Sequence, residues 1–450
     1  MFSTITDLVK HLFSSEDLTS NEKHIPVSFL DGKILTLSDL RDDVRRLFDD
    51  IQDWPNGPVA ISHHESYNFA VTLLALLNTS RDIAFPQNDK NDTLSELSEK
   101  GFHVFVNGEL IITTTPLGNC DANCQNLIFF TSGSTGQPKE IRKDICHLEQ
   151  EVLCLERQWG EGIENTITLS TVSHQHIYGM LFKIIWPLSV GRPFLSKNID
   201  YWEDLKALCA TDFLSQFEYN LISSPAHLTR YPDQFLLDVS EKPVKVFSSA
   251  GPLSFEAAQK TKQCLNTLPY EILGSTETGG MAWRRQYQQP EYWKAFDVVK
   301  LSVSTRNTLA VVSPFIGENK NFETNDLVEF HGYKKFLLKG RIDRIVKVEG
   351  KRVSLPDLEF FLKAHDWVED AAVLILNDER KSVSAVLTLS QAGRSLLKEI
   401  GKFRMGRKLR EEMSSKFDLV TIPRRWRFVD NIPQNAQGKR VFTELNALFD

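Results

Sequence analysis

Four short, largely apolar stretches of this sequence end abruptly at a small polar residue or a glycine. They are residues 127–130 before Thr131, 221–222 before Ser223, 244–247 before Ser248 and 271–273 before Gly274. Over the first 340 residues such β-rich runs alternate with helical patterns, an order that predicts parallel sheets covered by helices. Ligands of open α/β sheets bind beyond the carboxyl ends of the strands, so the four ends predict one shared cleft.

The first of these ends continues as TSGSTGQPKE, a loop rich in hydrogen-bond donors. Its hydroxyls and glycine-freed backbone N–H groups would suit phosphate oxygens, and a lysine adds positive charge at the far edge. It is not a Walker P-loop, because the Gly-Lys pair does not stand at the required offset. Composition alone leaves a flexible surface loop as an equal alternative. The residues concerned are Thr131, Ser132, Gly133, Ser134, Thr135, Gly136 and Lys139.

Composition places the chain among soluble globular proteins with more than one domain. It has 450 residues, of which 41% are apolar and 25% charged. The start has no secretory signal pattern, and no uninterrupted apolar run is long enough to span a bilayer, so we expect a cytoplasmic protein without a membrane partner. Six dispersed cysteines favour free thiols, and for Cys120 and Cys124 a plain loop is favoured over a zinc site.

The last hundred residues differ from the rest in charge and in pattern. Residues 341–450 hold 21 Lys and Arg against 16 Asp and Glu, a net charge of +5, whereas residues 1–340 carry −12. A charged segment at 339–362 leads to β-rich runs at 370–376 and 382–389, which indicates a compact α+β domain. We therefore predict two domains, 1–341 and 342–450. Within the first domain, apolar residues in a 3-4-3-4 spacing from Ile145 to Trp159 predict a helix that faces the core.

Residues 131–140 resemble the signature T-S-G-[ST]-T-G-x-P-K of the adenylate-forming superfamily, which includes acyl-CoA synthetases, nonribosomal adenylation domains and luciferases. Only Glu140 departs, where the family commonly has Gly. Further segments resemble later family motifs in the family's order: SSAGPLS at 248–254, LGSTETGG at 273–280, TNDLV at 324–328, GRIDRIVKVEGKRVSLPDLE at 340–359 and IPQNAQGKR at 432–440. Two departures are Leu273, where most relatives have an aromatic residue against adenine, and Asn325 in place of Gly.

The resemblance implies an α/β fold with a large N-terminal domain of helix-covered, largely parallel sheets and a small β-barrel-like subdomain. A small, mobile α+β C-terminal domain carrying the catalytic lysine would follow. The implied reaction joins a carboxylate to ATP, giving an acyl-adenylate and pyrophosphate, and then transfers the acyl group to a thiol. ATP and Mg²⁺ are the implied cofactors.

The resemblance also assigns roles to single residues. The loop from Thr131 to Gly136 and Lys139 would bind the β- and γ-phosphates, Thr276 would lie near the α-phosphate, and Glu277 would hold Mg²⁺. Lys439 would be the catalytic lysine that bridges carboxylate and α-phosphate, and Asp343 the hinge. The remaining nucleotide-binding candidates are Ser249, Ala250, Gly251, Pro252, Gly274, Ser275, Asp326 and Arg341.

The identity of the acid rests on residues 170–181, STVSHQHIYGML. Amino-acid-activating relatives have an Asp there, and this stretch has no carboxylate, so an amino acid is not expected. The overlapping segment SHQHIYGMLFKIIWPLSVGRPF, residues 173–194, resembles stand-alone ligases of aryl polyene pigment clusters, which load an aromatic acid such as 4-hydroxybenzoate onto an acyl carrier protein. His174 and His176 could share a strand face and bind a metal, but a pocket wall is favoured. The predicted pocket and catalytic side chains are His176, Tyr178, Gly179, Met180, Ser224, Gly279 and Met281.

The thiol acceptor is predicted from charge. Basic segments at 402–410 and 423–427 would suit an acidic acyl carrier protein, although coenzyme A phosphates would be attracted equally. Nucleic acid is not expected, because the body is acidic and no nucleic-acid motif is present. The leading hypothesis is an aryl acid to carrier-protein ligase. An aryl- or fatty acyl-CoA ligase and a nucleotide-binding pseudoenzyme scaffold remain as alternatives.

Overall fold

The structure is a computed structural model, and contacts divide the chain into two compact units. The first comprises Met1–Leu301 and Val311–Phe322, and the second Ser302–Ala310 and Glu323–Asp450. The predicted domain division after residue 341 stays a prediction. The residues that the structure describes are 2–86, 88–111, 125–132, 138–211, 214, 217–317, 320–348, 351–377, 381–434 and 440–450.

One sheet of the first unit has the strand order β6-β5-β3-β4-β7-β8. Its four central strands run parallel, and antiparallel partners flank them, β6 beside β5 and β8 beside β7. The strands are β3 (Val59–Ser62), β4 (Ile83–Phe85), β5 (His103–Val106), β6 (Glu109–Ile111), β7 (Leu127–Ser132) and β8 (Pro138–Lys143). A parallel centre buried on both faces explains why these strands are apolar runs and not alternating patterns.

The second sheet of this unit places β13, β12, β11, β9, β10 and β1 side by side as parallel strands. Antiparallel strands β14 and β15 follow β13, and β2 pairs with β1. The strands are β1 (Pro26–Leu30), β2 (Lys33–Thr36), β9 (Thr166–Ser170), β10 (Phe194–Leu195), β11 (Glu218–Ser223), β12 (Lys245–Ser248), β13 (Tyr270–Ser275), β14 (Gly279–Arg284) and β15 (Trp293–Ala295). The predicted α/β class with largely parallel sheets is confirmed.

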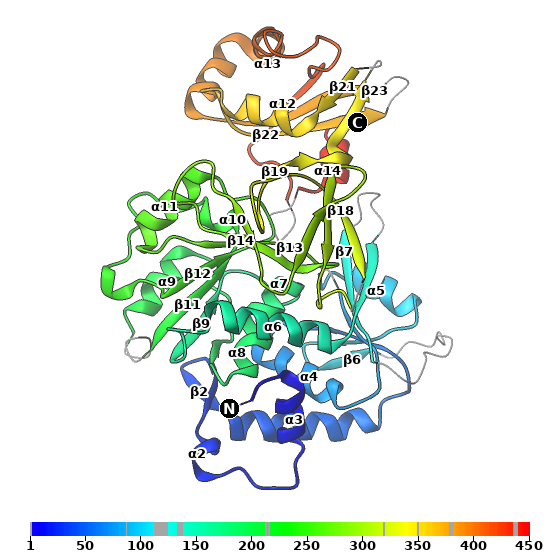
Figure 1. Ribbon diagram of the computed structural model, residues 1–450, viewed down its shortest axis with the longest axis vertical. Coiled ribbons are helices and arrows are strands. Elements are labelled where there is room, and N and C mark those ends of the chain that lie inside the picture. Colours follow the sequence, from blue (N-terminus) through cyan, green and yellow to red (C-terminus); the bar gives the residue numbers. More distant parts are fainter. Residues whose placement is uncertain are drawn as a thin grey trace. The chain divides into compact units, whose positions relative to one another are not determined.

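Helices cover these sheets (Figure 1). The sequences of two of them show why they are buried. Helix α4 (Ser66–Leu77) is apolar on nearly every side, and ten of its twelve residues are buried, as expected for a helix inside a core. Helix α6 (Ile145–Trp159) confirms the predicted stripe, and Trp159 packs against the rings of Phe247 and Trp283 at 5.1 and 6.0 Å. The others are α1 (Ile5–Leu12), α2 (Ser20–Lys23), α3 (Leu37–Gln52), α5 (Asn91–Glu99), α7 (Ile177–Gly179), the π-helical η1 (Met180–Ile185), α8 (Trp186–Ser189), α9 (Trp202–Cys209), α10 (Pro225–Leu228), η3 (Val239–Glu241) and α11 (Phe255–Leu265).

Strands β16 to β19 lie at the end of the predicted first domain and are the candidates for the expected β-barrel-like subdomain. Strand β18 pairs with β19 in antiparallel fashion, and the register shifts between Asp326 and Val328. Closure into a small barrel stays a prediction. The strands are β16 (Lys300–Val303), β17 (Thr308–Val312), β18 (Asn321–Phe330) and β19 (Lys335–Arg341).

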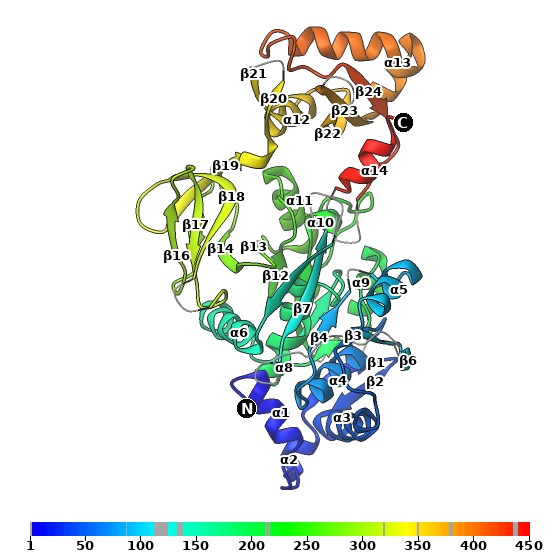
Figure 2. The same cartoon turned by 90° about the vertical axis from the view of Figure 1, so that its right-hand side faces the viewer.

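The second unit contains a three-stranded sheet in the order β22-β23-β24, with β22 and β23 antiparallel (Figure 2). Alternation along β22 decides which helices cover which face: Ala371 and Val373 pack with α12 and α13, whereas Ala372 and Leu374 pack with α14. The elements are η4 (Ile342–Arg344), β20 (Ile345–Val348), β21 (Lys351–Ser354), α12 (Leu355–Lys363), β22 (Val368–Asn377), β23 (Lys381–Leu389), α13 (Gln391–Met413), β24 (Arg425–Phe428) and α14 (Phe442–Ala447). Among the helices of the described residues, none has the length and apolar character needed to cross a membrane.

Candidate active site

Three neighbouring parallel strands of the second sheet bring their carboxyl ends to one edge. Strands β11, β12 and β13 end at Ser223, Ser248 and Ser275, and Ser223 is the register partner of Ser248. The next residue after β12 ties two of these ends together, because the Ser249 hydroxyl donates to the carbonyl oxygen of Ile272 at 2.9 Å. The following residues, Ala250 to Pro252, are half-buried or exposed, and Ala250 has a φ of 75°. This edge therefore presents accessible polar groups, as the sequence predicts.

The β7–β8 hairpin carries the predicted phosphate loop. Thr131 pairs with Lys139 across the hairpin, and its hydroxyl donates to the Lys139 carbonyl at 3.4 Å. The Lys139 side chain is 60% exposed and is thus available to an anion. Gly133, Ser134, Thr135 and Gly136 lie outside the described residues, as does the side chain of Ser132. The cysteines of the zinc alternative, Cys120 and Cys124, also lie outside them.

The turn between β13 and β14 carries the predicted T-E motif and is organised by its own hydroxyls. Thr278 is fully buried, and its hydroxyl accepts from the backbone N–H of Ser275 at 3.1 Å. Gly274 and Ser275 are exposed and Thr276 is half-buried. The Glu277 carboxylate is 26% exposed, and its Oε1 lies 3.5 Å from Nζ of Lys139.

The contact between Lys139 and Glu277 joins the two sheets of the first unit at the predicted site. Lys139 comes from the edge hairpin of one sheet and Glu277 from the turn after β13 of the other. Two motifs separated by 138 residues are thereby brought side by side. The arrangement can hold an anion at the ammonium and a cation at the carboxylate, which is the pair of charges that a metal–phosphate complex presents.

Beneath this contact lie two buried charged residues that the sequence reasoning missed. Nζ of Lys143 donates to the carbonyl oxygens of Phe315 at 2.9 Å and Glu277 at 3.2 Å. A carboxylate oxygen of Glu151 accepts from the backbone N–H of Gly280 at 2.7 Å. Burial lowers the pKa of the Lys143 ammonium and raises the pKa of the Glu151 carboxyl, while each charge opposes the shift of the other.

The sequence did contain a signal for Glu151. It stands three residues after Leu148 and four before Leu155, so it lies on the apolar face of α6, where a charge needs a partner. Lys143 likewise shares the face of β8 with Lys139, because alternate residues of a strand point the same way.

The predicted acyl pocket surrounds α7 and the start of η1. The Tyr178 hydroxyl donates to the carbonyl of Ser223 at 3.2 Å, and burial raises its pKa. Met180 and Met281 are buried, with 1% and 2% of their surfaces exposed. The hydrogen bond to Ser223 places Tyr178 at the carboxyl end of β11. Ser224 is also buried there, and its hydroxyl lies 3.5 Å from Nδ1 of His227.

Two glycines of the predicted pocket are required by close packing. A Cβ atom at Gly179 would lie 2.0 Å from the carbonyl oxygen of Ser173. A Cβ atom at Gly279 would lie 2.6 Å from Oε2 of Glu151, and Gly279 has a φ of 65°, which favours glycine. Without side chains, Gly179 lets the Ser173 carbonyl approach closely, and Gly279 does the same for the Glu151 carboxylate.

The strand arrangement considered for His174 and His176 is wrong. Strand β9 ends at Ser170, and both histidines lie in the following segment, with His176 at the N-cap of α7. Both ring nitrogens of His174 are already used, Nδ1 with the Ser66 hydroxyl at 2.8 Å and Nε2 with the carbonyl of His63 at 2.9 Å. His174 is therefore a hydrogen-bonded core residue. His176 is half-buried, and its place beside the acyl pocket stays a prediction.

Within the described ranges, a single group of three metal-ligand side chains lies close together: Asp144, Cys146 and His147 at the start of α6. Its geometry is that of a helix cap, because Nδ1 of His147 accepts from the backbone N–H of Asp144 at 3.2 Å. We assign no metal to it.

Asp326 and Arg341 belong to the second unit and contact each other there. They are register partners in the β18–β19 hairpin, with Oδ1 of Asp326 3.3 Å from Nη1 of Arg341. Only 16% of the Asp326 side chain is exposed, against 48% for Arg341. The predicted hinge residue, Asp343, lies in η4, and its side chain is outside the described residues.

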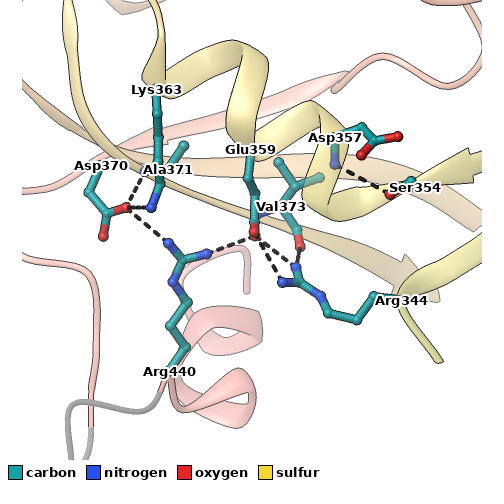
Figure 3. Close-up of polar contacts among 9 residues, drawn as sticks. All are labelled: Arg344, Ser354, Asp357, Glu359, Lys363, Asp370, Ala371, Val373 and Arg440. Atoms are coloured by element: carbon teal, nitrogen blue, oxygen red, sulfur yellow. Dashed lines mark hydrogen bonds and ion pairs between the residues drawn. The ribbon is translucent and has the colours of Figure 1, made fainter. Parts of the chain in front are cut away.

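A polar cluster in the second unit surrounds the residue that follows Lys439 (Figure 3). Oε1 of Glu359 accepts from Arg344 at 2.7 Å, from Arg440 at 2.8 Å and from the backbone N–H of Val373 at 2.8 Å. Arg440 also donates to Asp370 at 2.9 Å. Lys439 itself lies outside the described residues.

Comparison with known proteins shows which enzymes and structures this chain is similar to. No protein-family model matches the chain. A 4-coumarate–CoA ligase of Cereibacter sphaeroides is 24% identical over 69% of this chain and 69% of its own length. The human mitochondrial malonate–CoA ligase is 23% identical over 70% of this chain and 64% of its own length. The structure of ATP-bound MatB from Rhodopseudomonas palustris covers all of this chain with a TM-score of 0.73 at 16% identity, and the chain covers 99% of it.

The chain is thus similar to enzymes of the adenylate-forming superfamily over about 70% of its length, and it shares their fold over all of it. These similarities identify it as an AMP-forming ligase of the acid–thiol class. The comparisons support the predicted superfamily, and the predicted α/β fold with a large N-terminal and a small C-terminal domain is confirmed. The narrower resemblance to ligases of aryl polyene clusters has no counterpart in these comparisons and remains a proposal, as do the roles of the single residues.

Proposed function

We propose that this chain is a member of the adenylate-forming superfamily and activates an aryl carboxylic acid with ATP and Mg²⁺. The acyl-adenylate would form with release of pyrophosphate, and the acyl group would pass to the phosphopantetheine thiol of an acyl carrier protein. The observation that carries the proposal is the 3.5 Å contact between Lys139 and Glu277. It brings the hairpin of the Ser/Gly-rich loop to the turn of the T-E motif, and neither motif alone would bind a metal–nucleotide complex.

The described residues fit such a complex. Lys139 is exposed at the base of the loop, where it can meet a phosphate, and Glu277 has a partly exposed carboxylate that can accept a cation. In the second unit, Asp326 would accept hydrogen bonds from the ribose hydroxyls, with Arg341 reinforcing that region. When bound, ATP supplies the α-phosphoryl group that the acid attacks, and Mg²⁺ neutralises phosphate charge.

The chain's own residues would then offset the repulsion between the substrate carboxylate and the triphosphate of ATP. Lys139 would hold the terminal phosphates, Glu277 the metal, and Thr276 a hydrogen bond to the α-phosphate. The ammonium of Lys439 would bridge the carboxylate and the α-phosphate. Fixed charges aimed at the developing charge are the largest contribution that a protein makes to reactions of this kind.

An aryl acid is favoured by the surroundings of the predicted pocket. Tyr178 contacts the ring of Phe182 at 4.9 Å, and Met180 and Met281 supply flexible apolar surface. The stretch 170–181 has no carboxylate that would pair with an amino group. Among the relatives, the name 4-coumarate–CoA ligase denotes an aryl substrate, whereas malonate–CoA ligase denotes a dicarboxylic acid.

A carrier protein as acceptor is favoured by exposed basic residues of the second unit. On and near α13, Lys402, Arg404, Arg407 and Lys408 are exposed, and so are Arg424 and Arg425. Carrier proteins are acidic, so this charge would speed their encounter. Coenzyme A is the second candidate, because the two relatives named above are CoA ligases.

Acid-dependent pyrophosphate release, measured over a set of aromatic and fatty acids, tests the proposal. We expect release with aryl acids, and product formation with a phosphopantetheinylated carrier but not with coenzyme A. Turnover with coenzyme A alone would identify an aryl- or fatty acyl-CoA ligase instead. Binding of ATP without acid-dependent exchange of labelled pyrophosphate for any acid would identify a nucleotide-binding pseudoenzyme and refute the proposal.

A further inference from the structure

The turn that presents Glu277 is held from below at two backbone atoms. The first of these atoms is the carbonyl oxygen of Glu277 itself, which accepts a hydrogen bond from the Lys143 ammonium at 3.2 Å. It also donates to the carbonyl of Phe315 at 2.9 Å, which fixes the ammonium between two segments. Lys143 is 4% exposed, so water does not compete for these bonds.

Glu151 holds the same turn at its other end. Its carboxylate accepts from the backbone N–H of Gly280, and Gly279 packs so closely against it that a Cβ atom there would lie 2.6 Å from Oε2. Glu151 is 4% exposed and comes from α6, whereas Lys143 comes from β8. Two elements outside the turn therefore determine where its backbone lies.

A buried lysine and a buried glutamate are expensive to keep unless they are paired and hydrogen-bonded. Here both form hydrogen bonds with the backbone of one six-residue segment, 275–280, and Lys143 forms a second bond with Phe315. Lys139, which lies on the same face of β8 as Lys143, contacts the carboxylate of Glu277 from the exposed side. One strand thus contacts Glu277 twice, once at its carbonyl and once at its carboxylate.

We propose that Lys143 and Glu151 are positioning residues, which fix the turn at 275–280 so that the Glu277 carboxylate faces the metal–phosphate complex. The inference rests on the proposed function, since it takes Glu277 as the metal-binding carboxylate. Neither residue touches nucleotide or acid. Their effect is transmitted through the backbone of the turn, so it concerns Mg²⁺-dependent binding and the adenylation step.

The test compares Lys143→Met, Glu151→Gln and the double variant Lys143→Met/Glu151→Leu with the wild-type full chain. Calorimetric titration with ATP is carried out with Mg²⁺ and again in EDTA. For Lys143→Met we expect the Kd for ATP with Mg²⁺ to rise at least 10-fold, and the Kd in EDTA to change less than 2-fold. The Mg²⁺ concentration for half-maximal pyrophosphate release should rise by a similar factor. Glu151→Gln keeps an oxygen for Gly280, so a smaller change in the same direction is expected.

The double variant separates positioning from simple stability. Because it leaves no unpaired buried charge, its Tm should return to within a few degrees of wild type, while Mg²⁺-dependent ATP binding stays weak. Recovery of both Tm and Mg²⁺-dependent binding would overturn the proposal. Should Lys143→Met fail to fold, the double variant and Glu151→Gln give the result.

Lys183→Met is the matched control. Lys183 is also a fully buried ammonium, and it donates to the carbonyl of Ser196 at 3.0 Å and to Oδ1 of Asn198 at 2.7 Å, away from the turn. We expect this variant to lose stability yet keep the Mg²⁺ dependence of ATP binding. An equal loss of Mg²⁺ dependence in Lys183→Met would refute the positioning role. A wild type that binds ATP with Mg²⁺ but activates no acid would refute the proposed function alone.

Discussion

Arg440 donates a hydrogen bond of 2.8 Å to the carboxylate of Glu359, a residue of α12 that is 8% exposed. This bond and a second one to Asp370 tie the residue immediately after Lys439 to the core of the second unit. Lys439 therefore has a fixed neighbour on its C-terminal side. If Lys439 is the catalytic lysine, the bond should matter to catalysis as well as to stability.

We predict that Arg440→Met lowers the free energy of unfolding of the second unit by about 2–3 kcal/mol. The buried Glu359 carboxylate would lose one charged partner and keep Arg344, so the loss should be smaller than for a fully orphaned charge. Urea unfolding measures the first effect, and acid-dependent pyrophosphate exchange should fall at least 10-fold. Lys408→Met, a change at an exposed position of α13, should alter neither quantity. Full activity in a destabilised Arg440→Met would contradict the anchoring role.

Lys439→Ala should separate the two half-reactions. Removal of the ammonium that would bridge carboxylate and α-phosphate should cost roughly 3 kcal/mol or more of transition-state stabilisation in adenylation. Transfer of the acyl group from a supplied acyl-adenylate to the thiol needs no such bridge and should remain within a few-fold of wild type. Single-turnover assays of each half-reaction measure this, and an equal loss in both would rule out the assigned role.

Gly179→Ala should be among the most damaging single changes near the predicted pocket. The new Cβ atom would meet the Ser173 carbonyl oxygen at 2.0 Å, a contact that only a backbone shift can relieve. We expect a loss of roughly 3 kcal/mol in stability, typical of strong overpacking, together with a higher KM for the acid. Gly251→Ala, whose nearest contact would be 3.8 Å, serves as the stability control. Similar thermal unfolding of the two variants would show that the segment before α7 adapts freely.

Sequence patterns were enough to predict helices and strands, because these depend on residues close together in the chain. The spacing from Ile145 to Trp159 predicted α6. Three of the four apolar runs, those before Ser223, Ser248 and Gly274, form parallel strands whose ends meet at one edge, whereas the run before Thr131 is β7 of the other sheet. The site was predictable only through motif resemblance, which placed Lys139 and Glu277 in one reaction. No local pattern relates Lys143 to a carbonyl 134 residues away, so this hydrogen bond becomes visible only when the two sheets are seen together. The same limit applies to His174. The sequence could not show that its ring nitrogens bond to His63 and Ser66, because these partners come from a distant segment.

Lys183 leads to a prediction about pH. Its ammonium is fully buried in η1, and burial lowers its pKa from 10.5 to about 7, an effect that the charges of Glu65 and Asp200 partly oppose. Between pH 7 and about 10 the unfolded chain therefore binds a proton that the folded protein has released. Stability must rise with pH wherever the unfolded state binds more protons, so the cost of burying this positive charge opposes folding most below pH 7 and progressively less above it.

The comparison of wild type with Lys183→Met isolates that contribution. We expect the Tm of the wild type, taken relative to that of the variant, to be flat below pH 7 and to increase by several degrees from pH 7 to 9.5. Lys197→Met removes an exposed ammonium whose pKa is raised by its ion pair with Asp31, so it should show no such increase. Differential scanning calorimetry across this range decides the matter. Parallel pH profiles for wild type and Lys183→Met would mean that Lys183 stays protonated in the folded protein, held by Asn198 and the Ser196 carbonyl.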